Sequence, residues 1–420
     1  MENKVVNDDI ELLDIQKLRK KKIIQRVKKT VVGLIIGATV ITYLPTLNFN
    51  VNLFFAQNDS SITSVVNDDN MSMRDKARYL FELGMDKNSR VSDDLKETII
   101  TSFENYVIDE YSDYFTEKYL YNMYTSAKTV KVKEMSDYAK EHGWWSGSYN
   151  SSFNEYSVLG KDDYLIVAHE QLHASLKKGR MGYGLTTGIK GYAVNEGLTI
   201  SHVSKDGGYY DEMMIANYIG LIIGKDKINN AYFNCDLNSI KVELEKYLEP
   251  SEVEQLIKSS DIVTLGDYFD TFLYRNDLIK IIDRDRISNI IRENNKKVME
   301  LIRKAYENKY NTMVDSNGYG RVLFGKGSYY EKCMLYNGIN IDEPTYSILD
   351  VGPDNYMIRL YYHCNRKFYH QDILVSNEEL KNFDIDKEIN GIKEEALNDM
   401  KNNVAHSSNV RSVDYLSYLP

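Results

Sequence analysis

His169-Glu170-Gln171-Leu172-His173 is the most informative segment of this 420-residue sequence. Residues four apart lie on one face of an α-helix, so His169 and His173 can bind one metal ion through their imidazole nitrogens. Glu170 is rotated toward an open coordination position, where zinc and a carboxylate together activate water. The flanking residues 164–168 and 174–176 are apolar and contain no Pro or Gly, which predicts a buried helix. The alternative is a solvated helix with two ordinary His, but polar groups inside so apolar a stretch need partners.

Glu196 is the predicted third metal ligand. Between residues 174 and 210 the only carboxylates are those of Glu196 and Asp206. Asp206 lies between a Lys and two Gly in a turn-like stretch that is better suited to solvent. Glu196 follows the apolar residues 192–194 and precedes 197–200, where we expect a second helix to begin and to cross the first. Two imidazoles and a distant carboxylate are therefore expected to converge.

The motif followed by Asn195-Glu196-Gly197 resembles the gluzincin metallopeptidases, the thermolysin-like group in the broad sense. The resemblance implies that His169, His173 and Glu196 bind zinc and that Glu170 is the general base. It implies an α+β, zincin-like fold, in which a small mixed sheet precedes the motif helix and a helical half follows it. Residues 145–149 and 154–159 are similar to the strand pair that precedes the motif helix in bacterial members.

The sequence departs from thermolysin's own pattern at Ile200. Thermolysin has an acidic residue four places after the third ligand, and this residue orients a zinc-bound His through its second nitrogen. Because Ile200 cannot do so, the partner of that nitrogen must come from elsewhere in the chain.

A donor for the oxyanion that forms during peptide hydrolysis is also needed, and the sequence leaves its identity open. Near the motif in sequence are Tyr183, Tyr192, His202, Tyr209 and Tyr210. The chain contains 34 Tyr, so a packing role is the alternative for each of them. His142, next to two Trp, is either a residue of the cleft or an ordinary loop His.

The N-terminal segment predicts a membrane anchor. Residues 31–47 are nearly continuously apolar, about the length that spans a bilayer. Residues 17–29 include eight basic residues and no acid, and positive charge stays on the cytoplasmic side. We therefore expect a basic cytoplasmic tail at 1–29, a single transmembrane helix at 30–50 and a remainder outside the cell. Secretion after cleavage near Ala56 is the alternative.

Composition agrees with an exported protein. Residues 31–420 carry 43 basic and 57 acidic side chains, a net charge of −14, which disfavours nucleic acid as a partner. Cys235, Cys333 and Cys364 are odd in number and widely spaced, so no disulfide framework is expected. The richness in Asn, Lys, Ile and Tyr, with only five Pro, is typical of a bacterium with an A+T-rich genome.

Three regions are expected after the anchor: a polar linker at 51–73, a peptidase region at 74–312 and a β-rich accessory region with a C-terminal helix at 313–420. Apolar spacing predicts several helices and strands. The helices are expected at 73–85, 92–108, 115–126, 209–223, 240–248, 250–259, 265–272, 286–308 and 377–402, and strands within 130–159 and at 346–351, 356–363 and 367–375. His363 and His370 fall in neighbouring expected strands, where they could form a second metal site or be ordinary surface imidazoles.

Two functions fit these features. The first is a zinc-dependent peptidase, anchored in the membrane, that hydrolyses extracellular proteins or peptides with Glu170 as general base. The second is a non-catalytic cell-surface binding protein on a zincin scaffold, in which any metal is structural. The sequence does not indicate the cleavage preference or the oligomeric state.

Overall fold

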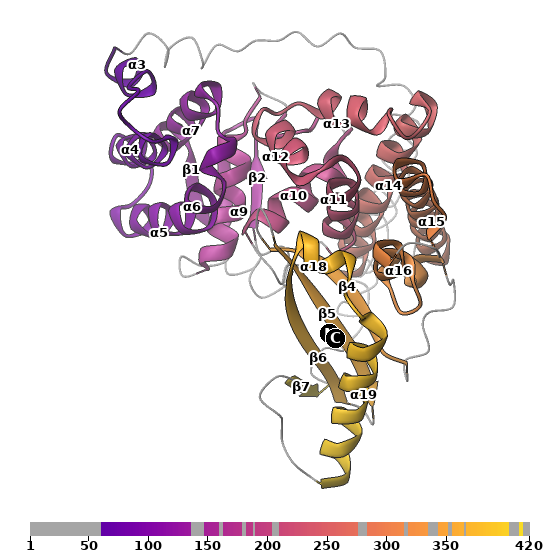
Figure 1. Cartoon of the computed structure of the whole chain (residues 1–420). Helices are drawn as coiled ribbons and strands as arrows, with labels where there is room; N and C mark the ends of the chain where they lie inside the picture. Colours follow the sequence, from indigo (N-terminus) through magenta and orange to yellow (C-terminus); the bar gives the residue numbers. More distant parts are fainter. Residues whose placement is uncertain are drawn as a thin grey trace, which may run out of the picture.

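The computed structural model describes residues 60–135, 147–158, 163–178, 182–187, 190–203, 210–275, 284–314, 318–334, 343–351, 355–364, 367–402 and 411–414. Over these residues the chain is α+β and mostly helical, with two small sheets. In Figure 1 the first helices form one end of the main body, the small three-stranded sheet and α9 lie in the middle, and α10 to α15 form the other end. The four-stranded sheet and α19 extend below.

The first helices form a layer that packs on the motif helix. They are α3 (Ser60–Val66), α4 (Met73–Asp86), α5 (Asp93–Phe103), the π-helical η2 (Glu104–Ile108), α6 (Asp109–Tyr111), η3 (Ser112–Tyr114) and α7 (Glu117–Thr129). Side-chain caps start two of them, since Ser72 accepts the Asp75 N–H and Thr116 accepts the Tyr119 N–H. The helices expected at 73–85, 92–108 and 115–126 are thus confirmed.

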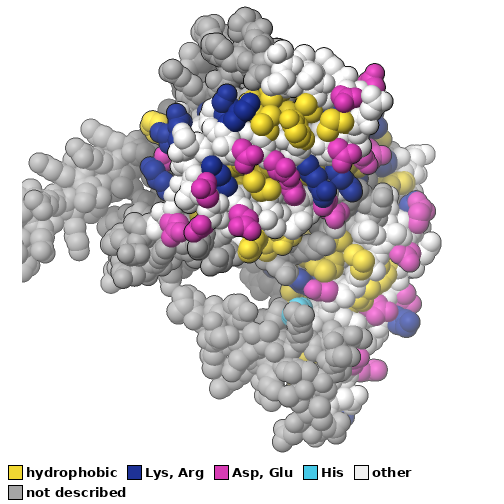
Figure 2. All heavy atoms as spheres, turned by 90° about the vertical axis from the view of Figure 1, so that its left-hand side faces the viewer, with side chains coloured by type: hydrophobic (Ala, Val, Ile, Leu, Met, Phe, Trp, Pro, Cys, Tyr) yellow, Lys and Arg dark blue, Asp and Glu magenta, His cyan; other side chains and the backbone are white. Residues whose placement is uncertain are grey.

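Residues 60–66 differ from the expectation of a polar linker, because they form helix α3. Three apolar side chains hold this helix, since Ile62 and Val66 are buried in the core and Val65 packs against it. Figure 2 looks onto the end of the molecule that carries the N-terminal helices, and there basic and acidic side chains alternate across the surface. Arg78 and Asp109 form one such pair, with 2.6 Å between Nη2 and Oδ1.

The first sheet is small and mixed, as expected. Its order is β1 (Lys131–Glu134), β3 (Glu155–Val158), β2 (Gly147–Asn150), with β1 parallel and β2 antiparallel to β3. Alternation along β3 buries Tyr156 and Val158 in the core. Among the described strands β2 pairs with β3 only, so it is an edge strand.

The helical half follows the motif helix α9 (Tyr164–Ser175). It comprises α10 (Tyr192–Val203), α11 (Tyr210–Ile223), α12 (Lys225–Phe233), α13 (Leu237–Leu244), α14 (Pro250–Arg275) and α15 (Arg284–Tyr310). Helix α12 was not expected, α13 covers 237–244 and not 240–248, and two further boundaries differ from the expectation. Helix α10 begins at Tyr192 and not near Gly197, so Glu196 lies inside it, and the two short helices expected between 250 and 272 are one continuous helix.

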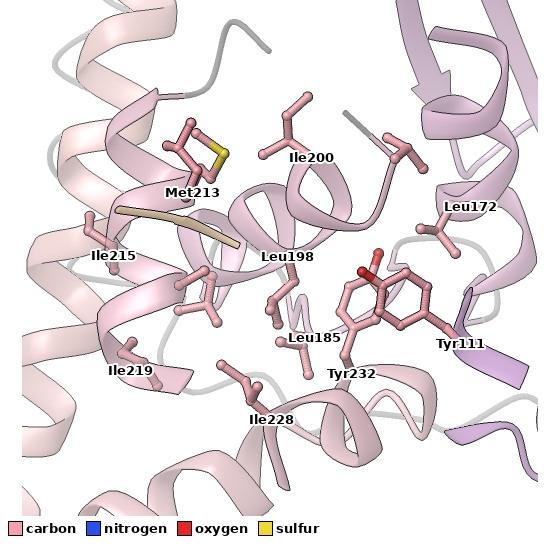
Figure 3. Packing of buried hydrophobic residues seen from close by; sticks show 14 of the residues in the cluster. Tyr111, Leu172, Leu185, Leu198, Ile200, Met213, Ile215, Ile219, Ile228 and Tyr232 are labelled. Carbon is pink, nitrogen blue, oxygen red and sulfur yellow. The ribbon is translucent and has the colours of Figure 1, made fainter. Parts of the chain in front are cut away.

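The apolar core joins the layer of N-terminal helices to the helices that follow α9 (Figure 3). Leu172 of α9 and Tyr111 of α6 face Leu198 of α10, while Met213 lies on α11 and Tyr232 on α12. All of these side chains belong to one buried cluster. Because α9 and α10 both contribute to this cluster, their relative position is set by apolar packing.

The C-terminal part contains the expected strands and also two helices that were not expected. Helices α16 (Gly318–Phe324) and α17 (Tyr329–Met334) precede an antiparallel sheet in the order β4 (Thr345–Asp350), β5 (Asn355–Cys364), β6 (Lys367–Ser376), β7 (Arg411–Asp414). The single helix expected at 377–402 is two helices, α18 (Asn377–Lys381) and α19 (Ile385–Asn402). This sheet shares the core of the helices, because Tyr346 and Ile348 of β4 belong to the same buried cluster. The Asn217 amide of α11 also donates to the carbonyl of Ile348 at 3.2 Å.

Within the described part of the chain, no helix combines the length and the apolar character needed to cross a membrane. The basic tail expected at 1–29 and the transmembrane helix expected at 30–50 lie outside the described residues.

Candidate metal centre

The motif helix α9 is buried along most of its length. Asp163 caps it by accepting the Ile166 N–H, and every residue from Val167 to Ser175 is buried. His169 and His173 are 7% and 3% exposed, so neither imidazole is a solvated surface group. The buried helix that the sequence predicted is confirmed, and the solvated helix is excluded.

Glu196 of α10 meets both imidazoles. The two Nε2 atoms of His169 and His173 are 3.0 Å apart, and Glu196 Oε2 lies 3.2 Å from His173 Nε2 and 3.5 Å from His169 Nε2. The three ligand atoms all lie within 4.8 Å of one another, and the group could hold a metal ion. The convergence expected from the sequence is therefore seen, since two Nε2 atoms and one carboxylate oxygen face a common point.

Burial and the neighbouring imidazoles act in opposite directions on Glu196. Burial disfavours the ionised carboxylate, but His173 and His169 favour it by charge and by hydrogen bonding and hold the pKa of Glu196 well below its ordinary value. The two imidazoles therefore favour the ionised carboxylate, which is the form that binds a metal ion.

Glu170 lies beside this triad but points to the sheet. Its side chain is buried, and its Oε1 is next to Gly147 at the start of β2, where an added Cβ would lie 2.5 Å from that oxygen and 2.6 Å from Ile166 Cγ2. Burial is the main cause that raises the pKa of Glu170 to about 8, while the charge of His169 lowers it. A buried carboxyl group that gains and loses a proton near neutral pH is suited to act as a base.

The three residues Asn195-Glu196-Gly197 have separate roles. Asn195 Oδ1 accepts the N–H of Leu185 at 2.9 Å, which holds the preceding loop against the helix. Gly197 faces the first turn of α11, where an added Cβ would lie 2.5 Å from the carbonyl carbon of Glu212. Close approach of α10 to α11 therefore requires glycine at this position.

Tyr183, one of the candidate oxyanion donors, lies at the triad. Its hydroxyl donates to Glu196 Oε1 at 3.2 Å, and its ring meets the His173 ring edge to face with 4.7 Å between centroids. The Tyr183 ring also contacts two other tyrosine rings edge to face. The centroid of Tyr192 is 6.5 Å away, and that of Tyr149 of β2 is 5.5 Å away. Three tyrosines thus form one wall of the centre.

His202 and Tyr210 do not belong to this wall. His202 is six residues after Glu196 on α10, and its ring packs in an aromatic cluster, 4.9 Å from Tyr232 and 4.1 Å from Tyr111 between centroids. Tyr210 packs against Tyr329 with 5.5 Å between centroids. Both have packing roles. The other candidates in the cleft, Tyr209 and His142, lie outside the described residues.

The acidic residue that Ile200 replaces would bond the second ring nitrogen of a zinc-bound His, and in His173 this nitrogen is Nδ1. His173 Nδ1 is buried and has no hydrogen-bond partner among the described residues. Ile200, where thermolysin's pattern has its acidic residue, is buried in the apolar core. The described part of the chain therefore supplies no acidic partner to this atom.

The sequence did not indicate Asp261 of α14. Its carboxylate is buried and accepts two backbone N–H groups at the start of α10, from Gly191 to Oδ2 and from Ala193 to Oδ1, each at 3.0 Å. No local pattern could have revealed this residue, because it lies 65 positions after Glu196 and is surrounded by ordinary helix sequence.

His363 and His370 are not opposite each other in their strands. The register of β5 and β6 places His370 against Tyr361 and His363 against Phe368. Within the described residues, the triad is the one group with the composition and spacing of a metal site.

No protein-family model, curated protein or solved structure matches this chain.

Proposed function

We propose that this chain is a zinc-dependent peptidase of gluzincin type that hydrolyses peptide bonds of extracellular proteins or peptides. The observation that carries the proposal is the buried convergence of His169, His173 and Glu196, next to a second buried carboxyl group, Glu170. Two such carboxyl groups with pKa values shifted in opposite directions indicate separate tasks, one as a ligand and one as a base.

The donor set fits zinc. Two imidazole nitrogens and one carboxylate are the three protein ligands of a class of catalytic zinc sites, whereas magnesium and calcium prefer oxygen ligands alone. A zinc ion bound there would lower the pKa of a coordinated water to near neutral and polarise the substrate carbonyl. Three ligand atoms among the described residues leave a coordination position for that water, as a catalytic site requires and a closed structural site does not.

Glu170 performs the proton transfers in this proposal. Its carboxylate accepts a proton from the attacking water and returns it to the nitrogen of the leaving amine. Burial supports this role, because it raises the pKa of Glu170 to about 8, close to neutral pH. Tyr183 is the donor best placed to stabilise the oxyanion, since its hydroxyl already lies beside the triad.

Strand β2 supports a peptide substrate. It is an edge strand among the described residues, and it begins at Gly147, against the Glu170 carboxyl group. An extended peptide could add to this edge by main-chain hydrogen bonds, which would bring a backbone carbonyl to the base and the triad. The fold consistent with these features is zincin-like, with α9 packed against β2 and β3.

The proposed location is the cell surface, with the N-terminus inside and the peptidase region outside. Its support is the sequence alone, namely the basic residues at 17–29 followed by the apolar segment at 31–47. A secreted form after cleavage remains the alternative.

The experiment uses Glu170→Gln in the full chain. We expect the variant to bind one zinc per chain, as the wild type does, and to lose cleavage of an unfolded protein by about 10²–10⁴-fold, the usual contribution of a general base. The matched control is Glu110→Gln, the same change at an exposed position of α6. Wild-type turnover in Glu170→Gln would reject the assignment.

A peptide-library digest with and without chelator separates the two functions. Chelator-sensitive cleavage supports the peptidase and reports its side-chain preference. A chain that holds zinc but cleaves no peptide would instead favour a binding protein with a structural metal.

A further inference from the structure

The start of helix α10 is capped by a side chain from another helix. The first N–H groups of an α-helix have no partner within the helix, and a side chain of the residue before it usually satisfies one of them. Here that residue is Gly191, which has no side chain, and Lys190 before it is exposed. Asp261 of α14 takes this role, accepting the Gly191 and Ala193 N–H groups on its two carboxylate oxygens and bonding to the Tyr192 N–H as well.

This contact lies one turn from the third ligand. Ala193 and Glu196 are three residues apart on α10, so the turn that Asp261 holds is the turn that carries the Glu196 side chain. The loop before α10 is held by the Leu185 N–H on Asn195 Oδ1, and it enters the helix through Gly191 at a positive φ of 76°. Apolar packing sets the position of α10 as a whole, and Asp261 of α14 holds the backbone of its first turn.

A buried carboxylate is costly, and an apolar residue would cover the same surface of α14 at lower cost. Thr264, one turn further along α14, is fully buried, and its hydroxyl donates within its own helix, at 3.4 Å to the Ser260 carbonyl. Asp261 differs from it in reaching across to α10. Its negative charge also suits the positive end of the α10 dipole.

We propose that Asp261 is a positioning residue of the metal centre, which fixes the first turn of α10 so that Glu196 Oε2 stays at the two His Nε2 atoms. The inference rests on the proposed function in one respect: it takes Glu196 to be a metal ligand. It does not require that the chain be an active peptidase. Asp261 acts through α10, and the metal affinity is the property it should control.

The test compares Asp261→Asn and Asp261→Ala with Thr264→Val in the full chain at pH 8. Zinc affinity is measured by competition with a chelating dye, and thermal unfolding is measured without metal. We expect Asp261→Asn to weaken zinc binding by about 10–100-fold, the range seen when partners outside the ligand shell are removed. Asp261→Ala, which keeps no acceptor, should weaken it further, and Thr264→Val should leave it within about 3-fold.

Cobalt provides a second measurement, because the visible spectrum of bound Co²⁺ reports the ligand set. A changed spectrum in Asp261→Asn, with an unchanged one in Thr264→Val, supports displacement of Glu196. If Asp261→Ala does not fold, Asp261→Asn decides the question, since it keeps the shape of the side chain and one acceptor oxygen. Wild-type affinity and spectrum in Asp261→Asn would overturn the inference.

The two proposals fail in different ways. A wild-type chain that binds zinc but cleaves no peptide removes the proposed peptidase, while the affinity of Asp261→Asn still decides the role of Asp261. A wild-type chain that cleaves peptides, together with unchanged affinity in Asp261→Asn, removes only the positioning role. A wild-type chain that binds no zinc would overturn both.

Discussion

Gly197→Ala tests whether the close approach of α10 to α11 holds the metal centre together. The added Cβ would lie 2.5 Å from the carbonyl carbon of Glu212 and 2.9 Å from Ala216 Cβ, whereas real Cβ contacts are essentially never under 3.0 Å. Helix α10 must therefore move away by at least about 0.5 Å, because backbone cannot relax by changing rotamer. This shift exceeds the roughly 0.2 Å tolerance of a metal–ligand distance.

The magnitude follows from two opposing terms. An extra methyl group in a packed interior costs about 1–3 kcal/mol, and a clash with backbone belongs at the upper end of that range. Replacing Gly by Ala inside a helix returns about 0.8–1 kcal/mol of helix propensity. We therefore expect Gly197→Ala to destabilise the metal-free chain by about 1–2 kcal/mol and to weaken zinc binding by at least about 10-fold.

Gly220→Ala is the matched control, because Gly220 is buried in the middle of α11 but has room for a methyl group. Its added Cβ would meet Ile228 Cγ2 at 3.5 Å, an ordinary van der Waals distance. This variant should gain about 0.8–1 kcal/mol and bind zinc normally. Chemical denaturation of both metal-free variants and zinc competition with the chelating dye supply the comparison. Equal stability and equal zinc affinity in the two variants would show that the contact at Gly197 does not hold the metal centre.

Three further predictions concern the same centre. Tyr183→Phe removes the hydroxyl that donates to Glu196 and should weaken zinc binding by about 10-fold. Tyr149→Phe loses a hydrogen bond within its own hairpin and should leave zinc binding unchanged. Identical zinc affinities of the two variants would contradict this prediction. Chelation should lower the stability of the wild type by about 2.7 kcal/mol when compared with zinc at 100 times its Kd, and His173→Ala should show no such response in the same thermal unfolding assay. Burial raises the pKa of Asp261 to about 7 from 3.8, so the folded chain binds this proton more tightly than the unfolded chain. As the pH rises from about 4 to about 7, the metal-free wild type should therefore lose stability relative to Asp261→Asn by roughly 1.4 kcal/mol per pH unit. A stability difference that is independent of pH would argue against the raised pKa.

The helices and the triad could be predicted because their determinants are local. Apolar spacing identified most helices, and the i, i+4 spacing of His169 and His173 placed both rings on one face before any tertiary contact was known. Glu196 was found by elimination because few carboxylates follow the motif. Strands β4 to β6 were found from their alternation for a similar reason.

The elements that were missed depend on contacts distant in sequence. Helix α3 is polar except for Ile62, Val65 and Val66, and it forms where these side chains reach a core built by later residues. The start of α10 was placed too late because its cap comes from α14 and leaves no N-cap residue in the local sequence. In the same way, the contact of Gly147 with Glu170 joins a strand to a helix, and neither residue predicts the other.

The cap supplied by α14 also bears on how small a working unit this chain can be reduced to. The proposed ligands and the base all lie between residues 169 and 196, so a protein engineer could cut the chain soon after α13. Such a fragment would retain every ligand and the base, yet it would omit the side chain that anchors the helix of the third ligand. Minimal versions of this protein should therefore extend at least through α14.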